Sequence, residues 1–587
     1  ATGGDYGEEN AARVTAGLDA YADAWVAARG EACVATRVRG EQSVELMDAR
    51  VACLDGRLGS LRALVDVLEG GAAVDRAIAA VGKLPAIDRC GDADFARAKT
   101  PVPEDKSRAE AVERLRERLS RVQALVLAGT YDAALDEARA LLERAEALGF
   151  EPFTTEVRLE HARALSLTGA HDEALAAFEV TYFAAERHGM DAVALEAAVD
   201  LVAEVGHHAA RFEEGLSWGR FARAKAERQG ERRLLGYMLT NEAALLDSKG
   251  ESEQALARDR EALDIFKSLR PPAPEDISLA LNHEGNILKG LDRLEEAHAV
   301  LTQALELRTE VFGAHHPMTA LTLNNLGIVE LRRGHTEAAL RTFERALELR
   351  VRALGADHPH VASTLINLGT AYPKVCQIER ARDVDERALE ILTAVHGEDH
   401  PRTAGVLNNL AGVHLDLGEL DKALQSFERA CLIWRETLPP EHQYIGMCHY
   451  NLARTYLALD RAEEALTEAQ AARDVWQLAL GPEATLITTA LVPMARALVK
   501  LARVDEAVGV AEEALRIAEL HEDNASRTAN ARLALAEALW ERGDQERART
   551  AARAAQRYAH AELTECDPQR IEVDAWIKAR EGAAPAG

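Results

Sequence analysis

A 42-residue internal repeat governs the middle of this 587-residue chain. His-Pro begins at 316, 358 and 400, and His442 keeps the same step with glutamine after it. Alanine occupies two registers of the repeat, seven times each. These positions are Ala255, Ala297, Ala339, Ala381, Ala423, Ala465 and Ala507, and then Ala262, Ala304, Ala346, Ala388, Ala430, Ala472 and Ala514. A fixed period of this length indicates stacked units that share one continuous core, and therefore a solenoid.

Each repeat reads as a helical hairpin. Apolar residues recur every three or four positions over about 317–333 and again over about 336–354, which is typical of one face of a helix. Pro317 suits a first helical turn, Gly334 a helix end with positive φ, and Thr336 an N-cap. Looser copies flank the regular ones, so we expect an all-α, right-handed α-solenoid of about eleven hairpins, preceded by a small helical N-terminal segment.

The order Leu326-Gly327, Ala339, Phe343, Ala346 resembles the tetratricopeptide (TPR) signature. The 42-residue period, with His-Pro before the first helix, resembles the kinesin-light-chain type of that repeat. The resemblance implies a superhelix whose first helices line a concave surface that binds proteins or peptides. It does not identify the ligand, because this fold serves many binding roles.

Four parts follow along the chain. Residues 1–105 lack the repeat and are predicted to form helices at about 11–29, 41–69 and 72–82. Irregular TPR-like repeats are expected over 106–270 and regular ones over 271–521. Residues 522–587 would hold a terminal repeat, a capping helix with Trp576 and Ile577, and a disordered tail.

The N-terminal segment resembles the non-catalytic region of large bacterial Ser/Thr protein kinases of the myxobacterial type. The matching residues are Trp25, Ala32-Cys33, Thr36-Arg37-Val38-Arg39-Gly40-Glu41-Gln42-Ser43, Asp48, Arg50, Cys53-Leu54, Arg57-Leu58 and the stretch Leu84–Asp92. In that family this region follows a kinase domain and a predicted membrane span. The chain itself has no Gly-rich loop with a strand lysine, no His-Arg-Asp and no Asp-Phe-Gly. We therefore expect a non-enzymatic C-terminal part of a longer signalling protein.

Charge and hydropathy narrow the partners. The chain has 97 acidic and 69 basic residues, a net charge of −28, which argues against nucleic acid as the main ligand. It has no run of 18 apolar residues that would span a membrane. The expected partner is a protein or peptide in the concave groove, and the alternative is a homo-oligomer. The expected compartment is the bacterial cytoplasm or, if the chain is attached to a membrane kinase, the extracytoplasmic side.

Cysteines and histidines give no metal or cofactor prediction. The seven cysteines have no zinc spacing. Cys376, Cys431 and Cys448 are expected to be buried apolar residues. Cys33 and Cys53 are two buried thiols or, on the extracytoplasmic side that the kinase resemblance implies, a disulfide. The histidines of the inter-repeat turns are expected to act as caps: His315, His316, His358, His360, His396, His400 and His442.

An asparagine row marks the predicted binding surface. In the TPR family the position before the Leu-Gly or Leu-Ala pair faces the groove, and here asparagine is interrupted by His283 and later by Pro493. The predicted peptide-binding residues are Asn241, Asn282, His283, Asn286, Asn324, Asn325, Arg332, Asn367, Lys374, Asn408, Asn409, Tyr450, Asn451 and Arg454. Alternatively, each amide ties its helix to the adjacent repeat. The repeat at 359–396 is irregular, with Pro373 inside a helix and Asp385 where Phe343 and Phe427 stand, so it is either a bend or an adaptation to a ligand.

The function that these patterns favour is a non-catalytic TPR scaffold that binds peptides or proteins, as the sensor or docking region of a bacterial signalling Ser/Thr kinase. A self-associating structural scaffold or a free-standing adaptor is the alternative.

Overall fold

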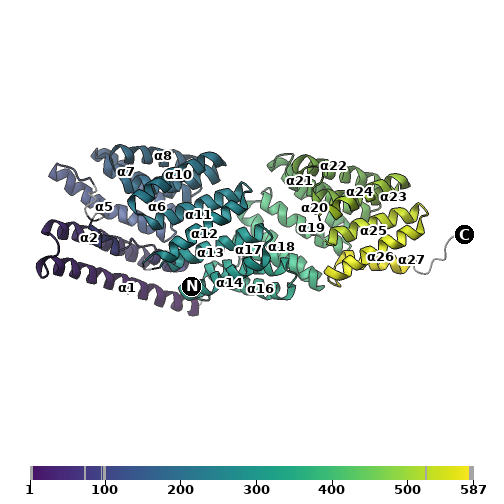
Figure 1. The fold of residues 1–587 in the computed structure, drawn as a ribbon, viewed down its shortest axis with the longest axis horizontal. Coiled ribbons are helices and arrows are strands. Elements are labelled where there is room, and N and C mark those ends of the chain that lie inside the picture. Colours follow the sequence, from purple (N-terminus) through teal and green to yellow (C-terminus); the bar gives the residue numbers. More distant parts are fainter. Residues whose placement is uncertain are drawn as a thin grey trace. The chain divides into compact units, whose positions relative to one another are not determined.

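The computed structural model describes residues 4–71, 74–93, 96, 101–270, 272–521 and 525–580. Over these residues the chain is helical and contains no strand, so the predicted all-α solenoid is confirmed. Figure 1 draws these helices. The chain divides into two compact units, Ala1–Val329 and Glu330–Gly587. Ten hairpins lie within one unit or the other, five from α5–α6 to α13–α14 and five from α17–α18 to α25–α26. The predicted tail at 582–587 lies outside the described residues.

The first unit begins with the segment that lacks the repeat. Its elements are α1 (Gly4–Arg37), α2 (Val44–Glu69), α3 (Val74–Gly82) and the 3-10 turn η1 (Asp88–Gly91). The repeats of this unit are α5 (Lys106–Leu127), α6 (Tyr131–Leu148), α7 (Glu151–Leu167), α8 (His171–Arg187), α9 (Asp191–Ala203), the π-helical turn η2 (Glu204–His208), α10 (Phe212–Gln229), α11 (Arg232–Ser248), α12 (Ser252–Ser268), α13 (Pro274–Gly290), α14 (Leu294–Phe312) and most of α15 (Pro317–Arg332). The first helix is longer than the predicted 11–29.

The second unit continues the hairpins to the C-terminal cap. Its elements are α16 (Thr336–Leu354), α17 (Pro359–Ala371), the 3-10 turn η3 (Tyr372–Val375), α18 (Ile378–His396), α19 (Pro401–Asp416), α20 (Leu420–Thr437), α21 (Gln443–Ala458), α22 (Ala462–Leu480), α23 (Thr485–Lys500), α24 (Val504–Leu520), α25 (Ala525–Glu541), α26 (Gln545–Glu562) and α27 (Pro568–Arg580). The predicted capping helix is α27, with Trp576 and Ile577 buried.

Buried small residues explain the hairpin packing. All fourteen register alanines are at most 1% exposed, so the two helices of each hairpin approach closely along these positions. Phe343 and Phe427 are likewise buried beside them. The turns follow the sequence with one correction. Gly334 has φ +80° as expected, but the N-cap of α16 is His335 and Thr336 is already helical.

The histidines of the turns cap the first helices. Nδ1 of His358 accepts a hydrogen bond from the backbone N–H of His360, at 3.1 Å. His316, His400 and His442 accept the same bond from the residue two positions later. The predicted cap role is therefore confirmed for these four residues.

The cysteine predictions need correction. Cys53 on α2 is joined to Cys90 in η1, with 5.6 Å between the Cα atoms, while Cys33 is a free and exposed thiol. The chain direction explains this: η1 folds back against α2, where Leu54 and Ile87 share a small core with Cys90. Cys376 is joined to Cys566, and Cys431 to Cys448, so these three residues are not simple buried thiols.

Candidate functional site

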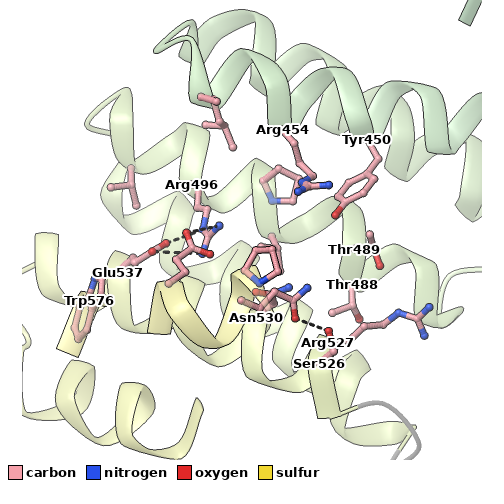
Figure 2. A pocket seen from close by; sticks show the side chains of 18 of the residues that line it. Tyr450, Arg454, Thr488, Thr489, Arg496, Ser526, Arg527, Asn530, Glu537 and Trp576 are labelled. Carbon is pink, nitrogen blue, oxygen red and sulfur yellow. Dashed lines mark hydrogen bonds and ion pairs between the residues drawn. The ribbon is translucent and has the colours of Figure 1, made fainter. Parts of the chain in front are cut away.

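The candidate site lies in the second unit, on the first helices of its last hairpins. A cavity of about 930 Å³ is lined by α21, α23, α25 and α27 (Figure 2). Tyr450 and Arg454 come from α21, and Pro493 and Arg496 from α23. The floor therefore consists of consecutive inner helices, and the capping helix contributes Trp576 to the wall.

A proline inside α23 removes one helical hydrogen bond beside this cavity. Pro493 is buried within the helix and has no N–H, so it cannot donate to the carbonyl of Thr489 four residues earlier. Thr489 and Pro493 both line the cavity. A backbone acceptor that lacks its helical donor therefore belongs to a residue that lines the cavity.

A partly exposed ion-pair network lies at the end of the cavity near the cap. Arg496 forms ion pairs with Glu537 at 2.9 Å and with Glu572 at 3.1 Å, which joins α23, α25 and α27. Burial raises the pKa of Glu537, and Arg496 opposes that rise. Burial opposes protonation of Arg496, but Glu537 and Glu572 raise its pKa above the usual value. Paired charges therefore attach the capping helix α27 to α23 and α25. The guanidinium of Arg496 is already engaged by two carboxylates.

Arg454 is far less tightly held. Its side chain is 39% exposed and stands 4.0 Å from Asp416, at the limit of an ion pair. Its guanidinium lies over the ring of Tyr450, 5.6 Å from the centroid. Figure 2 shows both side chains extending from α21 toward the side that carries Asn530. Burial raises the pKa of Asp416, Arg454 opposes this, and Asp567 adds to it. Arg454 therefore keeps donors available for an anionic group.

The repeats can be compared with known families. Models of the tetratricopeptide repeat match residues 276–350, 337–392, 374–436, 402–478 and 444–519, and a second such model matches 492–562. Residues 276–562 are tetratricopeptide repeats. A search of curated proteins finds no match.

Several solved TPR-like structures are similar. BtubC (BKLC) from P. vanneervenii is 24% identical, with a TM-score of 0.36 over 38% of this chain and 91% of that chain. Kinesin-light-chain TPR-like repeats from Podosopora anserina are 22% identical, with a TM-score of 0.31 over 35% and 99%. The apo quorum sensor NprR from B. thuringiensis is 15% identical, with a TM-score of 0.45 over 62% and 97%.

The asparagine row of the TPR array links successive inner helices where its bonds are described. Nδ2 of Asn451 donates to Oδ1 of Asn408 at 2.7 Å, and Nδ2 of Asn325 donates to Oδ1 of Asn282 at 3.2 Å. Nδ2 of Asn241 donates to the carbonyl of Val199 at 3.3 Å. These amides therefore tie neighbouring repeats together. A carboxamide has further donor and acceptor capacity, so ligand contact stays a prediction for this row.

The other predicted residues are scattered in exposure and partners. His283 lies 2.7 Å from buried Asp259, and Lys289 donates to Asn286 at 3.0 Å. Asn324 is buried. Asn367 and Asn409 are half-buried, and Arg332 and Lys374 are exposed. Of the predicted set, only Tyr450 and Arg454 line the large cavity.

The sequence prediction missed the far wall and Arg496. Arg496 lies 42 residues after Arg454, in the same register, so the period that identified Arg454 also marks Arg496. Asn530 and Trp576 lie in the terminal hairpin and cap, where the repeat is out of phase, so no register could have assigned them.

Proposed function

We propose that the second unit binds an extended peptide segment of a partner protein in the cavity beneath α21. The observation that carries this proposal is the cavity of about 930 Å³ on consecutive inner TPR helices, a volume within the range of ligand sites. Thr489 supplies a carbonyl for a peptide N–H, and Arg454 supplies donors for a carboxylate. The expected ligand is thus an extended segment with an acidic side chain or a C-terminal carboxylate.

The test is selection from a random peptide library on the immobilised chain, followed by affinity measurement of one selected peptide by fluorescence anisotropy. Arg454→Ala should weaken that peptide about tenfold or more, because a charge-assisted hydrogen bond is lost. Arg473→Ala is the matched control, since Arg473 lies on the outer helix α22 with a side chain 33% exposed. Equal effects of the two substitutions, or no selectable peptide, would overturn the proposal.

A finer proposal concerns the whole protein. The resemblance over Trp25 to Leu58 supports assignment of the chain to the sensor or docking region of a bacterial signalling Ser/Thr kinase. The gene sequence upstream of Ala1 tests it. A kinase domain followed by an apolar span of about 20 residues supports the assignment, and a start codon directly upstream contradicts it.

Three disulfides support an oxidising compartment for this chain, since such bonds persist outside reducing cytosol. Counting thiols in the denatured protein tests it. One thiol before reduction and seven afterwards is the expected result, because Cys33 alone is unpaired. Seven thiols before reduction would contradict it.

In the described part of the chain, no helix is both long and apolar enough to cross a membrane.

An aromatic patch favours self-association as the second candidate function. Phe183 on α8 and Phe221 on α10 are each 57% exposed, and both rings lie edge-on to Trp218. Large exposed aromatic surface is costly in water unless it is covered. Sedimentation across a concentration series tests this candidate. Dimerisation that disappears in Phe183→Ser/Phe221→Ser supports it, and a constant monomer mass excludes it.

A further inference from the structure

Three side chains with metal-ligating atoms lie close together in the first unit. His171 is the first residue of α8, and Glu204 and His208 are the first and last residues of the π-helical turn η2. One ligand atom from each residue lies within 4.8 Å of the other two. Among the described residues this is the one such group of three.

The π turn explains why two of these residues share a face. Glu204 and His208 are four positions apart, about one turn of helix, and the backbone N–H of Ala209 donates to the carbonyl of Glu204 at 3.0 Å. Close packing holds this turn. A Cβ atom on Gly206 would lie 2.4 Å from the Leu245 side chain, and one on Gly215 would lie 2.6 Å from the Gly206 backbone. Turns of this rare type occur frequently at functional sites.

Glu204 forms the base of the cluster. Its side chain is 3% exposed, and one oxygen accepts a hydrogen bond from the Ser166 hydroxyl. The other oxygen lies 3.2 Å from Nδ1 of His171. Over the described residues, neither lysine nor arginine forms an ion pair with this carboxylate. Burial of a carboxylate is costly unless a nearby positive charge compensates it, and a metal ion held beside the two imidazoles would supply such a charge.

The imidazoles form the mouth. The rings of His171 and His208 stack with centroids 3.7 Å apart and planes 11° apart. The His171 side chain is 37% exposed and His208 is exposed, so solvent reaches both rings. The arrangement is a buried oxygen ligand beneath two accessible nitrogen ligands.

We propose that His171, Glu204 and His208 bind one divalent transition-metal ion of the Zn²⁺ type. Two imidazole nitrogens and one carboxylate oxygen are ligands that Zn²⁺ accepts, with water in the fourth position. Tetrahedral ligands at Zn–N and Zn–O bond lengths of about 2.0–2.1 Å stand about 3.4 Å apart. The ligand atoms now lie within 4.8 Å of one another, and the two accessible imidazoles would turn inward to complete the tetrahedral spacing. Ser166 is a positioning residue, because its hydroxyl orients the carboxylate.

Bound metal would join the start of α8 to the turn between α9 and α10. These helices belong to successive hairpins of the irregular repeats, where the regular 42-residue register is absent. The ion would thus add a link at this junction to the ion pairs that Arg163 on α7 already forms with Glu196 and Asp200 on α9, each at 2.9 Å.

The test is calorimetric titration of the full-length, disulfide-intact chain with Zn²⁺ alone, in a Cys33→Ser background that removes the free exposed thiol. We expect one site, and a loss of affinity of tenfold or more in His171→Ala/His208→Ala and in Glu204→Gln. Ser166→Ala leaves all three ligands in place and should weaken binding by a smaller factor.

The matched control is His396→Ala/His400→Ala, since those two rings also stack, with centroids 4.5 Å apart. This variant should keep the affinity of the parent chain. Absence of a one-to-one site, or an equal loss in the control, would overturn the proposal and leave the contact between Glu204 and His171 as a hydrogen bond within the fold. Co²⁺ absorption gives a second readout. A tetrahedral visible band in the parent that is lost in Glu204→Gln supports the site, and its absence from the parent contradicts it. Circular dichroism confirms that each variant is folded.

Discussion

Two neighbouring hairpins of the second unit share one register but have different residues at the same buried position. In α19–α20 the aromatic Phe427 fills the inner position, and in α17–α18 the same position holds Asp385. Both side chains are 1% exposed. The residue that faces them is Ala411 in the first case and Gly369 in the second. The pair shows that the array accepts a buried carboxyl group at a position where the neighbouring hairpin buries a phenyl ring.

The same hairpins also end their first helices differently. α19 runs to Asp416, whereas α17 stops at Ala371 and continues as a 3-10 turn that contains Pro373. The residue after that turn, Cys376, has φ +60°, where the regular hairpin places Gly418 at φ +76°. A cysteine in this conformation costs about 1–2 kcal/mol relative to the usual right-handed one. Its disulfide with Cys566 makes that position a link to the turn before the cap.

The largest expected difference between the two hairpins comes from truncating the inner residue. Phe427→Ala should lower the free energy of unfolding by about 3–5 kcal/mol, because a buried phenyl ring is replaced by a cavity. Asp385→Ala should cost much less, since it removes a carboxyl whose Oδ1 has no hydrogen-bond partner in the described structure. Urea unfolding followed by circular dichroism measures both. Equal losses would show that the two positions carry the same packing load.

The second difference should depend on pH. Burial raises the pKa of Asp385 from its usual 3.8 to about 7. The folded chain therefore keeps this proton more tightly than the unfolded chain. The free energy of unfolding of the parent, relative to Asp385→Asn, should fall by about 2–4 kcal/mol as pH rises from about 4 to about 7, and then level off. Unfolding series at several pH values measure the difference. A pH-independent difference would place the carboxyl's pKa near its unfolded value.

The third difference concerns the link that the irregular hairpin makes. Cys566→Ser should lower the free energy of unfolding by about 2–4 kcal/mol, because it releases a long closed loop in the unfolded chain. Cys33→Ser should change it little, since that thiol is free and exposed. Thermal unfolding under non-reducing conditions compares the two variants. A loss no greater than that of the control would mean that the Cys376–Cys566 bond contributes no stability.

How far the sequence reached can be judged from these same positions. The period located every regular hairpin, because alanine at two fixed registers is required wherever two helices approach closely. It also located Asp385 and Pro373 as departures. It did not distinguish a bend from a ligand adaptation, and it gave no sign that Cys376, directly after the turn at Tyr372–Val375, is joined to Cys566, 190 residues away.

The candidate sites were harder to predict for the same reason. Tyr450 and Arg454 lie in the regular register and line the cavity, while their contact with a ligand stays a prediction. Trp576 and Asn530 face them from the cap and the terminal hairpin, and that proximity arises only after the helices stack. The sequence did not predict the cluster of His171, Glu204 and His208. This part of the chain has the pattern of two irregular repeats, and that pattern does not indicate the π-helical turn at Glu204–His208. Long-range pairing of side chains is a property of the superhelix and not of the repeat unit.

The smallest expected effect returns to the residue that faces Asp385. A Cβ atom at Gly369 would lie 2.3 Å from Asp385 Oδ1, so Gly369→Ala should lower the free energy of unfolding by about 1–3 kcal/mol through overpacking. A Cβ atom added at Gly405 in α19 would have no neighbouring atom within 4 Å. Gly405→Ala should therefore stabilise the chain by about 0.5–1 kcal/mol through helix propensity. Combining Gly369→Ala with Asp385→Ala removes the clashing carboxyl, so the double variant should be more stable than the sum of the two single changes predicts. Strict additivity in this cycle would mean that the effects of the two substitutions on the free energy of unfolding are independent. In that case, the absence of a Cβ atom at Gly369 is not what makes room for the Asp385 carboxyl.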